Sequence, residues 1–118
     1  MDKRRKKELR EQYKQMKPQM GVLIIRSTVT PKCYIQATQD LRGVMNGARV
    51  RLEAGIHPNK ELQKEWNEFG SESFVIEVLE SLEYEKDESK TDYSDDVALL
   101  QMMWEERVAK EGIELYRR

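Results

Sequence analysis

Two short apolar runs near the start of the chain predict a pair of neighbouring β-strands. Residues 21–26 are dense in β-branched side chains, residues 32–36 resume that character, and Pro31 ends the polar stretch between them. Short β-branched runs bounded by turn residues are typical of strands. The pattern therefore predicts a β-hairpin over residues 21–36.

Apolar side chains at helical spacing predict two consecutive helices after the hairpin. Asp40 is suited to cap a helix that runs to about residue 54 and ends at Gly55, and Asn59 opens a second helix that ends at Gly70. The inward positions predicted for these helices are Leu41, Val44, Met45, Ala48, Leu52, Leu62, Trp66 and Phe69.

The remaining pattern completes an α+β domain. Residues 73–80 alternate apolar and polar positions and predict a third strand, and residues 94–96 offer a cap and favourable charge for a last helix. The acidic stretch between them, residues 84–92, has few apolar groups with which to pack. The order of elements predicts a three-stranded antiparallel sheet flanked by helices.

Basic and acidic side chains are concentrated in different parts of the chain. Residues 1–17 carry eight basic and three acidic side chains and favour an extra basic N-terminal helix, whereas residues 76–106 carry eleven acidic and two basic ones. Such blocks suit outside partners or each other. The predicted organisation is a basic extension over residues 1–19, one domain over residues 20–110 and a tail over residues 111–118.

Composition excludes several classes of function. No apolar run approaches the roughly 20 residues of a membrane span, and the basic N-terminus lacks the apolar segment of a secretory signal, which predicts a cytoplasmic protein. The lone Cys33 and lone His57 make neither a disulfide framework nor a zinc constellation. The most economical role for Cys33 is that of a small buried hydrophobe.

The order and spacing of several motifs resemble the GIY-YIG nuclease domain. The resemblance rests on Gly21-Val22-Leu23 in the first strand, on Tyr34-Ile35-Gln36 in the second, and most specifically on HPNKELQKEWNEFGSESFVIEVLE from residue 57 to residue 80. This last stretch is similar to the phage homing-endonuclease branch. The resemblance implies metal-assisted phosphodiester hydrolysis by strand tyrosines, a helix arginine and histidine, and a glutamate that holds one divalent cation.

Four of the five chemical positions depart from that pattern. Leu23 stands for the first tyrosine, Val44 for the arginine, Ala48 for the histidine and Gln101 for the glutamate, and only Tyr34 is retained. A lone tyrosine with a pKa near 10 is a poor base without a metal. We therefore expect a catalytically inactive domain that needs no cofactor, with Mg²⁺ or Mn²⁺ relevant only if activity remains.

The alternative is an active, divalent-metal-dependent DNA endonuclease with a divergent site around Tyr34. Glu105, one turn beyond Gln101, is the nearest candidate metal ligand, and it also fits a solvated carboxylate. His57 fits a turn or capping residue better than a general base.

Partners are predicted from charge and from small residues. Weak, salt-dependent DNA binding would use the basic helix and exposed arginines and lysines, whereas another protein or a homodimer would pair the basic and acidic blocks. The candidate nucleic-acid-binding residues are Arg4, Arg5, Lys6, Arg42, Arg49 and Lys60. Gly43, Val44, Gly47 and Ala48 predict a small apolar face, either a surface covered by the N-terminal helix or by a second copy, or a relic of lost catalysis.

Overall fold

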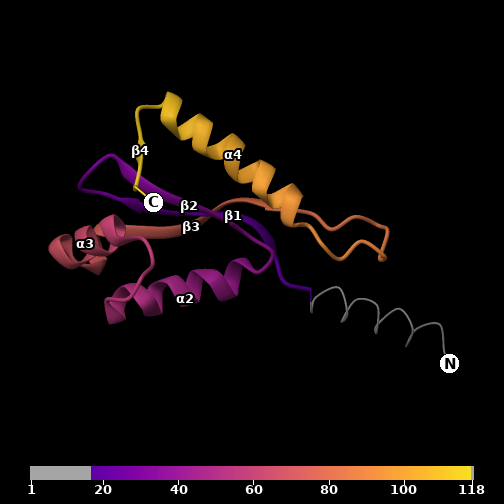
Figure 1. Ribbon diagram of the computed structural model, residues 1–118, viewed down its shortest axis with the longest axis horizontal. Helices are drawn as coiled ribbons and strands as arrows, with labels where there is room; N and C mark the ends of the chain where they lie inside the picture. The colour runs from indigo at the N-terminus through magenta and orange to yellow at the C-terminus, as the bar shows by residue number, and fades with distance from the viewer. Residues whose placement is uncertain (1–16, 118) are drawn as a thin grey trace.

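A four-stranded sheet separates the helices into two layers in the computed structural model, which describes residues 17–117. Helix α4 lies over one face of the sheet, and α2 and α3 lie over the other (Figure 1). The elements in chain order are β1 Met20–Ser27, β2 Lys32–Thr38, α2 Leu41–Ala54, α3 Lys60–Phe69, the 3₁₀ turn η1 Ser71–Ser73, β3 Phe74–Leu82, α4 Ser94–Lys110 and β4 Glu114–Leu115.

The sheet has the strand order β3-β1-β2-β4. β1 is antiparallel to both β2 and β3, as the sequence predicted for its three strands, and β4 runs parallel to β2. Since β1 is central and both of its faces are covered, its apolar run is nearly continuous rather than alternating. Leu23 and Ile25 pack beneath α2 and α3, and Val22 and Ile24 pack beneath α4.

Local capping groups fix the bounds of α2 and α3 where the sequence predicted them. Asp40 Oδ1 accepts a hydrogen bond from the Gly43 N–H at 3.1 Å, and Asn59 Oδ1 accepts one from the Leu62 N–H at 2.9 Å. Gly55 ends α2 with φ 78°, in the left-handed region that favours glycine. These helices therefore begin and end for reasons that can be read locally.

A fourth strand forms within the residues predicted as a tail. The Glu114 N–H donates to the Pro31 carbonyl at 2.8 Å, and the Tyr116 N–H donates to the Cys33 carbonyl at 2.9 Å. Tyr116 is 3% exposed and joins the core beneath α2 and α3. The last residues of the described chain are thus part of the packed domain.

The acidic connection between β3 and α4 is pinned at both ends by tyrosines, where the sequence predicted little packing. Tyr93 is 2% exposed, and its ring meets that of Tyr84 edge-on at 5.3 Å. The Tyr84 hydroxyl donates to the Pro18 carbonyl at 2.6 Å, and Lys17 Nζ lies 5.2 Å from the same ring. The acidic segment therefore begins beside the start of β1. The predicted basic helix lies outside the described residues.

Across residues 17–117, no helix combines the length and apolar character that a bilayer span requires.

Candidate functional site

A pocket of about 320 Å³ lies where the edge of β2 meets the loop before α3 and the side of α4. It is lined by Tyr34, Ile35, Gln36, Pro58, Asn59 and Gln101. Two of the five positions singled out in the sequence, Tyr34 and Gln101, thus share one pocket although they lie far apart in the chain. Sequence reasoning missed Gln36 and Asn59 as wall residues, and the only local signal was that of Asn59 as a helix cap.

Gln101 ties α4 to the edge of the sheet. Its Oε1 accepts a hydrogen bond from the backbone N–H of Ala37 at 2.8 Å. Ala37 lies on β2 beyond the two residues that pair with β4, so this amide satisfies a strand-edge donor that β4 does not reach. The side-chain oxygen of Gln101 therefore holds α4 against the edge of β2.

Leu23 and Ala48 belong to the core rather than to the pocket. Leu23 is fully buried, Ala48 is 3% exposed, and both lie in the cluster beneath α2 and α3. Val44 is partly buried against the same cluster. Ala48 faces the sheet, as its helical spacing predicted, so it is not part of a surface that the N-terminal helix or a second copy could cover.

The two glycines of α2 have different surroundings. A Cβ on Gly43 would collide with the Asp40 carboxylate that caps the helix, whereas a Cβ on Gly47 would meet nothing within 4 Å. The absence of a side chain at Gly43 is thus explained by close approach of the cap. Nothing in the structure explains the glycine at Gly47.

His57 supports the pocket from behind. Its ring meets that of Tyr34 edge-on, with centroids 5.3 Å apart and planes at 89°. His57 Nδ1 accepts from the Asn59 N–H at 3.0 Å, which is the capping role expected of it. Burial lowers the pKa of His57 below its ordinary 6.5, and nearby Arg51 lowers it further. The imidazole is therefore neutral at pH 7.

Two solved structures share this arrangement of strands and helices. The catalytic domain of homing endonuclease I-TevI is 22% identical with a TM-score of 0.65, covering 84% of this chain and 99% of that one. A glutamate-to-alanine mutant of the catalytic domain of intron endonuclease I-TevI is 23% identical with a TM-score of 0.64, covering 84% and 92%. The chain has a GIY-YIG-like fold. Neither a family model nor a curated protein matches the sequence.

The wall of the pocket does not fit the divalent cation that GIY-YIG chemistry implies. Mg²⁺ and Mn²⁺ prefer carboxylate oxygens, and none of the lining residues carries one. Glu105 is not among the lining residues, and its charge acts on Cys33, whose pKa is raised to about 11, first by burial and then by Glu105. Among residues 17–117, no three His, Cys, Asp or Glu side chains come together in a group that would hold a metal.

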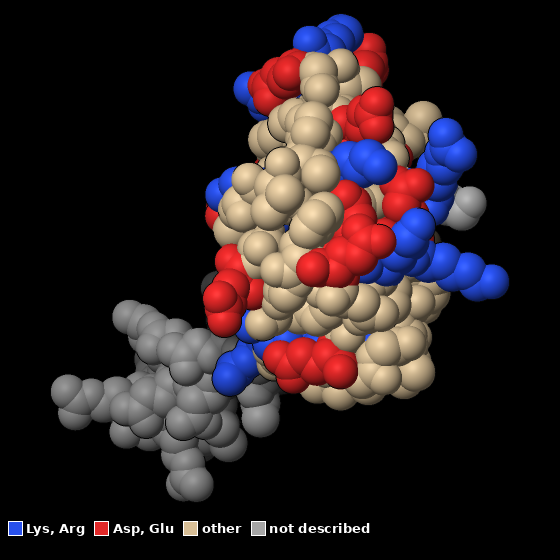
Figure 2. All heavy atoms as spheres, turned by 90° about the vertical axis from the view of Figure 1, so that its left-hand side faces the viewer, with Lys and Arg blue, Asp and Glu red and all other residues tan. Residues whose placement is uncertain are grey.

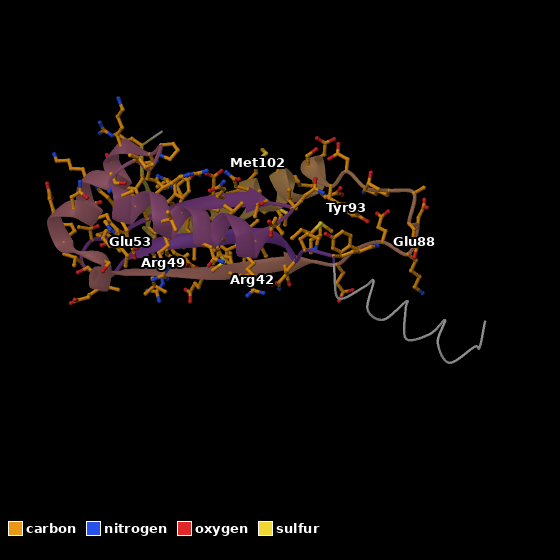
Figure 3. The ribbon with its side chains drawn as sticks, turned by 90° about the horizontal axis from the view of Figure 1, so that it is seen from below. Arg42, Arg49, Glu53, Glu88, Tyr93 and Met102 are labelled. Atoms are coloured by element: carbon orange, nitrogen blue, oxygen red, sulfur yellow. The ribbon has the colours of Figure 1, made fainter. Side chains whose placement is uncertain are left out.

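Basic side chains lie on α2 and at the start of α3. Arg42 and Arg49 are exposed, stand seven residues apart and extend from the same side of α2 (Figure 3). Lys60 is exposed directly after Asn59. At the end of the molecule that carries α3, acidic and basic side chains are interspersed rather than segregated (Figure 2). Arg4, Arg5 and Lys6 lie outside the described residues.

The outward face of α4 in this GIY-YIG-like fold carries three large apolar side chains. Leu99, Met102 and Met103 are 59%, 66% and 58% exposed, and Met102 is marked in Figure 3. Large exposed side chains gathered on one helix are common where proteins meet. A protein partner or a second copy of the chain stays a prediction.

Proposed function

We propose that this chain is a nuclease-like domain that binds nucleic acid without hydrolysing it. The observation that carries the proposal is the hydrogen bond from the Ala37 N–H to Gln101 Oε1. At the position where the resemblance implies a metal-binding glutamate, the chain has a neutral amide whose oxygen is already taken by the backbone. A divalent cation would have to compete with that bond without gaining a carboxylate.

Packing supports the same conclusion at three further positions. Leu23, Val44 and Ala48 contribute apolar surface to one core cluster instead of groups that donate, accept or carry charge. Leu23 and Ala48 are buried in that cluster, so a phenol or an imidazole in their place would need space that the core has filled. The packing at these positions therefore supports a domain without the catalytic side chains.

Nucleic acid is the partner that the exposed charges of α2 favour. Arg42 and Arg49 project from one side of α2, and Lys60 follows on α3. The similar solved domains are described as endonuclease catalytic domains. The acidic residues between β3 and α4 would repel a phosphate backbone, so the strand would approach from the side of α2. Binding of this kind is weak and salt-dependent.

Incubation with supercoiled plasmid and Mg²⁺ or Mn²⁺ tests the proposal. We expect no nicking, no heat of metal binding in calorimetry, and retardation of DNA in a gel that weakens as salt rises. Cleavage that disappears in Tyr34→Phe would overturn the non-catalytic function. It would instead favour an endonuclease with a divergent site, for which the location of Tyr34 in the pocket is the specific support.

A protein partner is the second candidate, and the exposed apolar side chains on α4 favour it. Sedimentation of the purified chain over a concentration series would reveal self-association. A monomer at all concentrations, together with salt-sensitive DNA binding, would leave nucleic acid as the better-supported partner.

A further inference from the structure

In two of the side-chain amides that line the pocket, the oxygen already accepts a hydrogen bond from the backbone. Gln101 Oε1 accepts from the Ala37 N–H at 2.8 Å, and Asn59 Oδ1 accepts from the Leu62 N–H at 2.9 Å. A backbone N–H is always a donor, so these bonds fix which end of each amide faces its partner. Among residues 17–117, neither amide nitrogen has an acceptor. Both NH₂ groups therefore remain as donors for a ligand in the pocket.

The pocket wall has no formal charge. Its residues are a tyrosine, an isoleucine, a proline and three side-chain amides, and His57 behind Tyr34 is neutral at pH 7. Cationic side chains are the strongest donors to a phosphate or carboxylate group, and this wall provides none. The donors of Asn59 and Gln101 instead suit a neutral ligand that presents carbonyl or ring-nitrogen acceptors.

The size and the lining of the pocket further limit the class of ligand that would fit. A volume of about 320 Å³ is at the lower end of the range for small-molecule pockets. The aromatic ring of Tyr34 and the apolar Ile35 and Pro58 contribute surface suited to a planar group. Bases of single-stranded nucleic acid combine a π-face, edge acceptors and zero charge.

Cationic side chains lie next to the pocket rather than in it. Lys60 is exposed and directly follows Asn59, and Arg51 is exposed and near enough to His57 to lower its pKa. Such an arrangement would suit a strand whose backbone charges lie outside the pocket and one of whose bases lies inside it. Contacts to phosphate position a strand, whereas contacts to the base edge distinguish it.

We propose that the pocket between β2, the loop before α3 and α4 binds an unpaired nucleobase through the amide NH₂ groups of Asn59 and Gln101. This inference rests on the proposed nucleic-acid-binding function, and it names the part of the nucleic acid that the pocket would hold. The chain would then favour single strands over duplex DNA, because a paired base cannot enter.

Fluorescence anisotropy with two labelled strands of equal length tests whether the base contributes to binding. One strand is a thymidine dodecamer, and the other has the same backbone with abasic tetrahydrofuran units. We expect the abasic strand to bind about tenfold more weakly. The two strands make the same phosphate contacts and have the same salt dependence, so only the missing base distinguishes them. Duplex DNA of the same length should also bind more weakly than the dodecamer.

Isosteric variants test the two donors. Gln101→Glu and Asn59→Asp keep an oxygen for Ala37 and Leu62 but remove the NH₂ donors, and each should weaken dodecamer binding by about tenfold. Gln19→Glu and Asn46→Asp make the same charge change at exposed positions outside the pocket, and should stay within about twofold. Thermal unfolding of all four variants checks that the fold is retained.

The outcomes separate the pocket from the wider function. Equal affinity for the two strands, with Gln101→Glu and Asn59→Asp behaving like their controls, would overturn the base pocket and leave nucleic-acid binding intact. Failure of every strand to bind would overturn the wider function.

Nuclear magnetic resonance tests the pocket directly. Thymidine added to the labelled full chain should shift the side-chain NH₂ signals of Asn59 and Gln101. If thymidine shifts neither signal, the nucleobase pocket is overturned. If a blocked tetra-alanine peptide shifts them and thymidine does not, the pocket belongs to an extended peptide instead.

Discussion

The ring of Tyr34 meets the imidazole of His57 edge-on, with the two centroids 5.3 Å apart. This contact joins the retained tyrosine of β2 to the loop that caps α3, and it keeps a titratable ring in a buried position. The geometry supports the wall of the pocket rather than a proton transfer. A buried neutral histidine also makes the fold sensitive to acid.

Stability should fall as the pH is lowered through the titration of His57. Burial holds the folded pKa below the ordinary value of 6.5, so the unfolded chain binds the proton more tightly. The contribution is complete above about pH 6.5 and is lost as the pH falls from there through the folded pKa. Urea unfolding between pH 7.5 and 5 measures it.

The control for this prediction is His57→Asn, which keeps an acceptor for the Asn59 N–H and removes the titration. The difference in unfolding free energy between pH 7.5 and 5 should be smaller in the variant than in the parent chain. An identical pH dependence in both would show that His57 is not its source.

Ala48→His should destabilise the domain. Ala48 is 3% exposed against the core cluster that contains Leu23, so an imidazole there would overpack the core and bury a polar ring. The expected loss is about 1–3 kcal/mol of unfolding free energy, measured by urea denaturation. Val50→His places the same ring on the exposed side of α2 and should cost much less. Equal losses would contradict the packing assigned to Ala48.

Gly47→Ala should stabilise the domain, and Gly43→Ala should not. A Cβ at Gly47 meets nothing within 4 Å, so the helix gains about 0.5–1 kcal/mol from replacing glycine. A Cβ at Gly43 would displace the Asp40 carboxylate, and loss of such a cap costs about 1 kcal/mol. Thermal melts of the two variants compare these effects. A similar rise in Tm for both would argue against a close cap.

Tyr116→Ala should be among the most damaging single changes. Tyr116 is 3% exposed in the core, and burial followed by Glu65 raises the pKa of its hydroxyl. Removing a buried aromatic ring costs about 3–5 kcal/mol. Denaturant unfolding of Tyr116→Ala, with the exposed Glu114→Ala as its control, measures the contribution of the last strand. A loss no greater than that of the control would show that the C-terminal residues do not stabilise the domain.

Replacing Arg42 and Arg49 together by Gln should weaken DNA binding and its salt dependence. If both arginines contact duplex phosphates, the slope of log affinity against log salt should decrease by about 1.8. Arg26 is paired with Glu77 at 3.1 Å, so Arg26→Gln is a control for lost positive charge outside α2. An unchanged slope in the double variant would exclude this side of α2 as a phosphate-binding surface.

Local chemistry explains why so much of the fold could be predicted. The bounds of α2 and α3 depend on Asp40, Gly55 and Asn59, whose capping and left-handed conformations act within a few residues. The strands β1 and β2 were visible for the same reason, as β-branched runs on either side of a turn. By contrast, β4 is two residues long and exists only because β2 has an edge to pair with.

The candidate site likewise has features that can be read from the sequence and features that depend on tertiary contacts. By itself, the sequence determined which groups are present: one retained tyrosine, a neutral amide at Gln101, and small apolar residues at Val44 and Ala48. Only the tertiary structure decided what they do, because Ala48 lies in the core while Gln101 crosses to Ala37, 64 residues away. Side-chain chemistry is written residue by residue, but burial and hydrogen-bond partners are set by segments that meet only when the chain has folded.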